Sequence, residues 1–323
     1  MIFMRDFYNK YKIGIIIFCI ALCARVVLFS LNFSHTNYNL VGAIHGDDGY
    51  YEISQGLIHG HGFTGSTVEP FVPNPLRPPV WPFTIALLVK IFGSYWAVLV
   101  FEILIGSLIP ILGMRIARRF SSRKVVWLGT GLLLCLEPYG VLLSSLLYTE
   151  TMFTFLFLIF FLFLIRYFRD KSLRNLVWMT VFLGLATLVK PTTQYIPIVI
   201  VLFILFDARK NVSRKVLQHI IILLALFIII LAPWLYRNYV TFGKVAMSAQ
   251  VSFNLYVYLV PTVLSYDNHT SFRVEYDKFI TDKRLDVNTI NLSNSDHYKD
   301  QAISILKDHK VALAKSIGTT IVT

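Results

Sequence analysis

Long apolar runs alternate with short polar segments along most of the chain. A run of about 20 apolar residues matches the hydrocarbon core of a bilayer, so each run is interpreted as a membrane-spanning helix. Several runs are shorter, and need boundary Tyr, Trp, Ser and Thr residues or snorkelling Lys and Arg side chains to complete a span. The pattern predicts seven spans, at about residues 13–31, 95–114, 125–143, 151–165, 175–189, 191–206 and 220–236.

The first apolar run could also be a cleaved signal peptide, because basic residues precede it and small residues lie within it. However, Arg25 and a further apolar stretch follow at once, and Cys23 lacks the small residue before it that a lipoprotein cleavage site requires. We therefore interpret residues 13–31 as an uncleaved transmembrane helix.

Two long polar segments interrupt the apolar pattern. Residues 32–82 are rich in Gly and Pro and too long for a simple connection, which indicates a functional loop; a short interfacial helix is expected at 81–92. Residues 237–310 are mixed in character and are expected to fold against the membrane face. The chain ends at Thr323 in an apolar stretch that looks like the approach to an eighth span, so we expect a C-terminally truncated single domain, 1–323.

Composition supports an all-α polytopic membrane protein. Hydrophobic residues make up 56% of the chain and charged residues 15%, with a mean hydropathy of +0.63. A soluble domain has roughly a quarter charged residues, so a soluble fold is excluded. The net charge of +12 does not indicate nucleic-acid binding, because the basic residues stand in short clusters between apolar runs.

The distribution of the basic clusters predicts the orientation of the chain. Four alternate segments share sixteen Lys and Arg residues: Arg5, Lys10, Lys12, Arg115, Arg118, Arg119, Arg123, Lys124, Arg166, Arg169, Lys171, Arg174, Arg209, Lys210, Arg214 and Lys215. The positive-inside rule places these segments and the N-terminus in the cytoplasm. The first polar loop, Glu150, Lys190 and Arg237 then lie on the external side.

The first polar loop carries three carboxylates within six residues, Asp47, Asp48 and Glu52. One could act as a general base while another orients a substrate or holds a metal. The alternative is a solvated loop that begins with an Asp-Asp-Gly turn.

Other acids lie at the ends of the predicted spans or inside them. Glu150 and Glu137 could be functional, since acids near spans are costly, or could simply cap helices. Glu102 lies about eight residues inside a span and cannot be a cap, so it is expected to face the interior or an aqueous cavity.

Cations on the external side are candidates for contact with a phosphate group. These cations could donate charge-assisted hydrogen bonds to phosphate oxygens, or could snorkel to lipid headgroups. They are Arg77, Lys190 and Arg237, with Arg25 as a fourth candidate because of its depth in the membrane. Three histidines near the acids could bind a divalent metal, but their spacing matches no strong zinc pattern: His45, His59 and His61.

Seven short motifs follow one another between residue 13 and about residue 260. They are Asp47-Asp48-Gly49-Tyr50-Tyr51, Arg77-Pro78-Pro79-Val80-Trp81-Pro82, Phe92-Gly93, Ala117-Arg118-Arg119, Thr149-Glu150-Thr151, Gly184 through Lys190-Pro191, and Pro233-Trp234-Leu235-Tyr236-Arg237-Asn238. In these motifs the chain resembles the GT-C glycosyltransferases that use lipid-linked sugars. That group includes the protein O-mannosyltransferases, the aminoarabinose transferases of lipid A and the lipopolysaccharide-core transferases.

The resemblance implies roles for individual residues. Asp47 would be the catalytic base and Asp48 its helper, and Tyr51 would contact the substrate. The donor phosphate would lie among Arg77, Lys190 and Arg237, in a pocket that Glu150 helps to shape. In aminoarabinose transferases an acid before the basic residue of the Pro-Pro motif helps to hold a metal. Leu76 stands there in this chain, so no metal site is assigned, although a divalent metal stays open.

The implied reaction is an inverting transfer of a sugar from a polyprenyl-phosphate donor to an acceptor hydroxyl on the external, periplasmic face. The acceptor could be a lipid, a glycan or a protein. The other expected partners are membrane lipids, with no nucleic acid, and the expected location is the bacterial inner membrane. The alternatives are a transporter or lipid-linked-sugar flippase without transferase activity, and an assembly subunit with a decayed site.

Overall fold

The computed structural model describes residues 2–46, 48–209 and 213–322. Every regular element within these ranges is a helix, which confirms the predicted all-α fold class. The chain divides into two compact units: unit 1 is Met1–Val72 with Pro78–Ala232, and unit 2 is Pro73–Arg77 with Pro233–Thr323.

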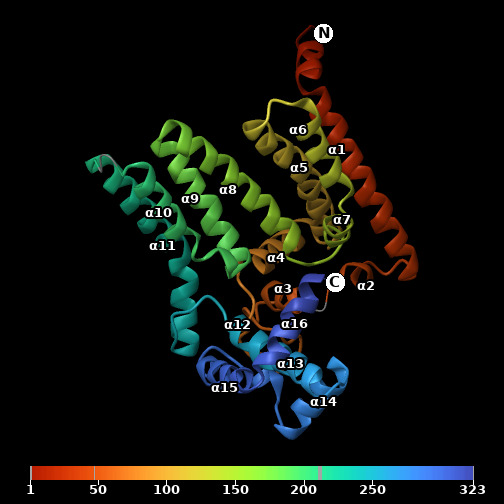
Figure 1. Ribbon diagram of the computed structural model, residues 1–323. Coiled ribbons are helices and arrows are strands. Elements are labelled where there is room, and N and C mark those ends of the chain that lie inside the picture. The colour runs from red at the N-terminus through yellow and green to blue at the C-terminus, as the bar shows by residue number, and fades with distance from the viewer. Residues whose placement is uncertain (1, 47, 210–212, 323) are drawn as a thin grey trace. The chain divides into compact units, whose positions relative to one another are not determined.

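Unit 1 contains the helices of the first two thirds of the chain (Figure 1). They are α1 (Ile2–His35), α2 (Leu40–Ile44), α3 (Tyr50–Ile58), α4 (Val80–Phe92), α5 (Trp96–Phe120), α6 (Lys124–Leu136), α7 (Pro138–Leu143), α8 (Glu150–Asp170), α9 (Leu173–Val189), a 3₁₀ turn at Pro191–Thr193, α10 (Ile196–Asp207) and the start of α11 (Arg214–Phe242).

The long apolar runs form long helices, as predicted for a polytopic membrane protein. Among the described residues, four helices have the length and hydropathy to cross a membrane: Lys12–His35, Trp96–Phe120, Glu150–Asp170 and Arg214–Phe242. The other three predicted spans coincide with apolar helices that are shorter, α6, α9 and α10. These helices are too short to cross a bilayer without polar or aromatic residues at their ends. The count of seven spans therefore stays a prediction.

Helix α5 is the central helix of unit 1. It packs against α1, α6 and α8, and α8 packs in turn against α9 (Figure 1). In the most apolar stretch of α5, about 67% is buried inside the protein, whereas the corresponding share is 22–28% in the other three long helices. Helices α9 and α11 approach closely at Gly184, where a Cβ atom would lie 2.8 Å from Cγ2 of Ile230. Only a residue without a side chain allows this approach.

The helix predicted at residues 125–143 is interrupted at Glu137. Pro138 has no N–H to continue the hydrogen bonding of α6, so the chain begins a new helix there. The Glu137 carboxylate caps α7 by accepting hydrogen bonds from the backbone N–H groups of Tyr139 and Gly140. Of the two roles considered for Glu137, the structure shows the helix cap.

A layer of short helices, α2 to α4, covers the end of unit 1 at which α1 ends and α5 begins. Its core contains Phe29 of α1, Tyr50 of α3, Trp81 of α4 and Tyr95 before α5, together with Leu147 from the segment before α8. Trp81 is fully buried. The observed helix α4, Val80–Phe92, agrees with the short helix expected at 81–92. This layer gives the long polar loop a fixed framework.

Unit 2 is built from short helices after α11. They are α12 (Gln250–Phe253), a π-helical segment at Asn254–Leu259, α13 (Val260–Asp267), α14 (Phe272–Asp282), a 3₁₀ turn at Val287–Thr289, α15 (Ser295–Asp308) and α16 (Lys310–Val322). Tyr256 and Phe279 meet edge to face in their apolar core.

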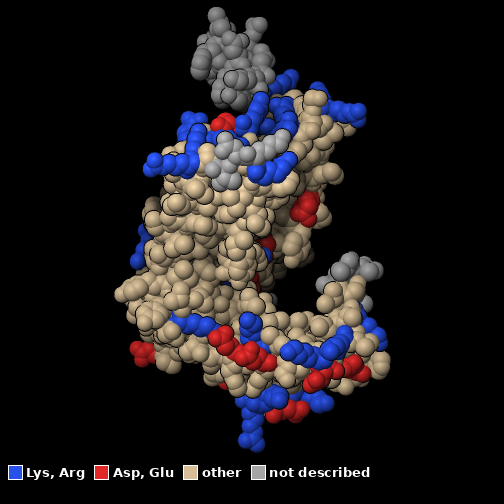
Figure 2. All heavy atoms as spheres, turned by 60° about the vertical axis from the view of Figure 1, so that its left-hand side comes forward, with Lys and Arg blue, Asp and Glu red and all other residues tan. Residues whose placement is uncertain are grey.

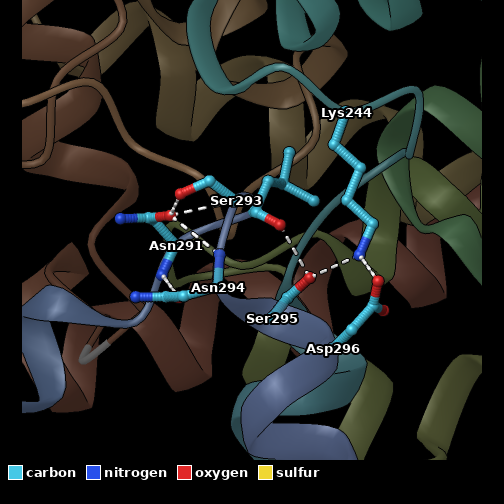
Figure 3. Close-up of polar contacts among 7 residues, drawn as sticks. Lys244, Asn291, Ser293, Asn294, Ser295 and Asp296 are labelled. Carbon is cyan, nitrogen blue, oxygen red and sulfur yellow. Dashed lines mark hydrogen bonds and ion pairs between the residues drawn. The ribbon is translucent and has the colours of Figure 1, made fainter.

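The start of α15 is fixed by polar contacts (Figure 3). Lys244 Nζ donates to Ser295 Oγ at 3.0 Å and lies 2.6 Å from Asp296 Oδ2. The hydrogen bond from Lys244 lowers the pKa of the Asp296 carboxyl group. The preceding turn is closed by Asn294 Oδ1, which accepts from the backbone N–H of Asn291 at 2.8 Å.

Candidate functional site

The acidic loop lies between α2 and α3 and is anchored on both sides. Asn32 Nδ2 donates to Ala43 O at 2.8 Å, and the backbone N–H of Leu147 donates to Ile44 O at 2.8 Å. Gly46 is buried against Tyr148, where a Cβ atom would lie 2.9 Å from Cζ of the ring. The chain immediately before the acids is thus fixed to the segment that leads into α8.

The predicted catalytic acids fall on this loop. Asp47 lies outside the described residues. Asp48 is half-buried, and the next residue, Gly49, has a φ of 75° and starts α3. A left-handed conformation of this kind favours glycine. Glu52, in the first turn of α3, contacts His45 Nε2 through Oε1 at 2.9 Å, so Glu52 and His45 close the loop from opposite ends.

Tyr51, the predicted substrate contact, belongs to an aromatic group on the same helix. Its ring centre lies 5.3 Å from that of His45 and 5.2 Å from that of Tyr95. The Tyr95 hydroxyl is hydrogen-bonded to Ser54 Oγ at 2.7 Å and accepts from Gln55 Nε2 at 2.8 Å. These contacts fix α3 to the start of α5.

Glu150 and Lys190, which sequence reasoning placed on the same side of the membrane, form an ion pair. Lys190 Nζ lies 2.9 Å from Glu150 Oε1. Glu150 is the first residue of α8 and Lys190 follows the last residue of α9, so antiparallel packing of α8 and α9 brings them together. Pro191 ends the helix at this point. The side chains are 35% and 37% exposed, which leaves both open to a ligand.

The ion pair and the acidic loop are joined through the segment before α8. Leu147, which is hydrogen-bonded to Ile44, precedes Glu150 by three residues, and Ile44 precedes Asp47 by three residues. Tyr148, which covers Gly46, lies two residues before Glu150. Unit 1 therefore brings the chain on either side of Asp47 and the Glu150–Lys190 pair to the same end of the helix bundle.

Two charged residues are buried inside unit 1 near this end. Arg25 of α1 is 2% exposed and Glu102 of α5 is 1% exposed, in agreement with the expectation that Glu102 faces the interior. Arg25 Nε lies over Gly106, where a Cβ atom would be 2.7 Å from it and 3.3 Å from Cγ2 of Thr151. Arg25 Nε, both Glu102 carboxylate oxygens and Thr151 Oγ1 have no hydrogen-bond partner among the described residues.

Arg77 and Arg237, the other predicted phosphate contacts, lie in unit 2 around Asn74. The Arg237 guanidinium donates from Nη1 to Asn74 O at 3.3 Å and to Asn238 Oδ1 at 2.8 Å. Asn74 Oδ1 accepts from the backbone N–H groups of Leu76 and Arg77 at 2.9 and 3.0 Å. Asn74 was not predicted from the sequence. Its position before a Pro-rich turn is the signal that could have indicated it.

The predicted cations therefore form two groups, one in each unit. Lys190 is paired with Glu150 in unit 1, and Arg77 and Arg237 share Asn74 in unit 2. Convergence of all these residues on one donor pocket stays a prediction.

Metal binding by the histidines gains no support from the described part of the chain. His61 stacks on Phe71 with ring centres 3.9 Å apart, and His59 stacks on His61. Among the described residues, no group of three or more His, Cys, Asp and Glu side chains could hold a metal ion.

The family model of the dolichyl-phosphate-mannose-protein mannosyltransferases matches residues 76–236. A comparison with curated proteins and a comparison with solved structures return no match. The matched range contains Arg77, Glu150 and Lys190 and ends one residue before Arg237, whereas the acidic loop lies before it.

Proposed function

Because residues 76–236 form a domain of the dolichyl-phosphate-mannose-protein mannosyltransferase family, we propose that the protein transfers a sugar from a polyprenyl-phosphate donor to an acceptor hydroxyl, with inversion, on the external face of the membrane. The observation that carries the proposal is the Glu150–Lys190 ion pair, held beside the ends of the acidic loop by Leu147 and Tyr148. A general base and a phosphate-binding cation are the two groups that this reaction needs most.

Asp47 acts as the general base of the reaction. It takes the proton of the acceptor hydroxyl as the oxygen attacks the anomeric carbon from the face opposite the donor phosphate. The new bond joins the acceptor oxygen to the anomeric carbon, and the bond from that carbon to the phosphate oxygen breaks. Asp48 assists Asp47, and Tyr51 contacts the sugar.

The cations stabilise the leaving group. Polyprenyl phosphate departs with the electron pair of the broken bond, and the charge on its oxygens grows in the transition state. Lys190 offsets this charge with charge-assisted hydrogen bonds, which are strongest where water is scarce. For Arg77 and Arg237 the same role stays the prediction that the sequence resemblance implies. The lipid tail of the leaving group stays in the bilayer, which accounts for a site at the membrane surface.

Glu150 holds the Lys190 side chain in place for the donor phosphate. An ammonium group has three N–H donors, and one contact with Glu150 leaves two for phosphate oxygens. The partial exposure of both side chains is consistent with this role.

The two ends of α8 support the proposed external location. Glu150 begins the helix, and Arg166 and Arg169 lie at its end, in one of the basic segments that the positive-inside rule places in the cytoplasm. The proposed location is the bacterial inner membrane with the N-terminus in the cytoplasm. The acceptor is a hydroxyl of a lipid, glycan or protein.

Reconstitution of the full chain in nanodiscs tests the reaction class. We expect radiolabelled sugar to move from a polyprenyl-phosphate donor to an acceptor extract, with release of polyprenyl phosphate, and no transfer from a nucleotide sugar. In sealed vesicles, movement of the intact lipid-linked sugar across the bilayer without transfer would instead support a flippase and contradict the proposal.

A further inference from the structure

A second candidate binding site lies at the opposite end of unit 1, where α5 and α8 end. A cavity of about 360 Å³ is lined there by Leu162 and by four arginines: Arg115, Arg118, Arg119 and Arg166. Along α8, Arg166 lies sixteen residues after Glu150, a rise of about 24 Å. The cavity is therefore distinct from the site proposed for transfer. Figure 2 shows Lys and Arg side chains gathered toward one end of unit 1.

The arginines in this cavity have no acidic partner among the residues that the structure describes. Within the described part of the chain, no ion pair joins any of the four to an Asp or Glu side chain. Arg118 is held by α6, with its guanidinium carbon 3.6 Å from the centre of the Trp127 ring. All four side chains are exposed, so water screens part of their mutual repulsion, and an anion bound between them would offset the rest. The lining of the cavity therefore favours a negatively charged ligand.

The chemistry of the lining points to a phosphate group. Guanidinium groups present planar forks of N–H donors that match phosphate oxygens, and they lose less hydration than ammonium groups on binding. The cavity volume lies within the ~300–1,000 Å³ of typical small-molecule sites. Leu162, which is 8% exposed, gives the cavity an apolar side, which suits a ligand with both a charged and an apolar part.

We propose that this cavity binds a phosphate group, carried either by the headgroup of an anionic phospholipid or by a free phosphate compound. The predicted topology places the cavity at the cytoplasmic leaflet, where anionic headgroups attract basic residues. The proposal does not depend on the transferase reaction.

The basic segments of this face also provide a matched control. Arg123, Arg169 and Arg174 carry the same charge and lie in the same predicted cytoplasmic segments, but they do not line the cavity. Like the cavity arginines, they contribute positive charge to the cytoplasmic segments and lie near helix ends. A loss confined to the cavity arginines therefore separates a built site from general positive charge.

The test compares two triple variants of the full-length, detergent-purified protein. R115Q/R119Q/R166Q removes three cavity arginines and leaves Arg118 on Trp127, and R123Q/R169Q/R174Q is the control of equal charge. Native mass spectrometry measures bound phosphatidylglycerol against phosphatidylcholine, and a separate titration uses inorganic pyrophosphate. We expect the wild type and the control to retain phosphatidylglycerol in preference to phosphatidylcholine, and the cavity variant to bind it at least about tenfold more weakly.

The two arms distinguish the source of the phosphate. Loss of pyrophosphate binding alone in the cavity variant would assign the site to a free phosphate compound. Equal losses in both triple variants, or no loss in either, would overturn the proposal. Should the cavity variant fail to fold, the single variants R166Q and R169Q make the same comparison, with phosphatidylglycerol-dependent thermal stabilisation as the readout.

Discussion

At the scale of single residues, Lys190 is the cation whose setting is best defined. Its partner Glu150 lies 2.9 Å away, and both side chains are about one third exposed. Ion pairs with this exposure contribute only about 0–1 kcal/mol to stability, because solvent screens the charges. The pair therefore matters more for placing an ammonium group at the membrane surface than for holding α8 against α9.

Lys190→Met is expected to lower the rate of sugar transfer by about 10²–10³-fold, the usual effect of losing one group that stabilises charge in a transition state. The melting temperature should change little, since an exposed ion pair adds at most about 1 kcal/mol. Initial rates and thermal unfolding of the purified variant measure the two effects. Lys190→Arg, which keeps the charge, should retain part of the activity. An unchanged rate in Lys190→Met would remove Lys190 from the site.

Single residues also show where prediction from sequence stopped. The charges of Glu150 and Lys190 and their positions next to apolar runs were enough to place both on one side of the membrane. Their contact depends on how α8 and α9 pack, and the periodicity of one helix does not specify its partner. The contact between Glu52 and His45 and the role of Asn74 were missed for the same reason, because each depends on a turn that is set by tertiary packing.

At the scale of helices, close packing in unit 1 depends on residues without side chains. Gly106 of α5 lies under the buried Arg25 side chain of α1, with Ser144 and Thr151 on either side. The apolar runs predicted where these helices lie. The position of Glu102 within a span predicted that it faces the interior, but the pattern did not predict the burial of Arg25, since burial of a charge is costly in most settings.

Gly106→Ala is expected to destabilise the protein by about 1–3 kcal/mol, as overpacking of a close contact does. The added Cβ would lie 2.7 Å from Arg25 Nε and 3.1 Å from Ser144 Cβ, and a buried arginine has little room to move. Gly129→Ala in α6 is the control, because a Cβ there meets nothing within 4 Å. It should be neutral or stabilising by up to about 1 kcal/mol. Chemical or thermal unfolding in detergent measures both, and equal stabilities would contradict this account of how α1 packs on α5.

At the scale of the whole molecule, the positions of the helices are predicted from sequence more directly than the site is. Alternation of basic and non-basic segments needs only counting, and the described helices fall where the apolar runs predicted them. Pro73–Arg77 belongs to the same compact unit as the C-terminal helices, and the hydrogen bond from the Ala249 N–H to Pro75 O is one contact between residues far apart in the chain that holds it there. The pattern of apolar runs does not specify such contacts. The expectation of a single domain, 1–323, stays a prediction.

Cysteine labelling tests the predicted orientation. In a variant with all three native cysteines replaced by Ala, Thr67→Cys lies in the predicted external loop and Ser122→Cys in the segment between α5 and α6; both positions are exposed. A membrane-impermeant maleimide should label the first in intact spheroplasts and the second only after permeabilisation, since the positive-inside rule places them on opposite sides. The reverse pattern would invert the topology and move the Glu150–Lys190 pair to the cytoplasm.

Transfer of labelled sugar from a polyprenyl-phosphate donor by Asp47→Asn tests the central claim most directly. The amide cannot take the proton of the acceptor hydroxyl, so transfer should fall by at least about 10²-fold while the amount of protein in the membrane stays the same. Glu69→Gln, at an exposed acid between α3 and α4, should keep wild-type activity, and Asp48→Asn should retain part of it. Full transfer by Asp47→Asn would contradict the assignment of the base and the mechanism built on it.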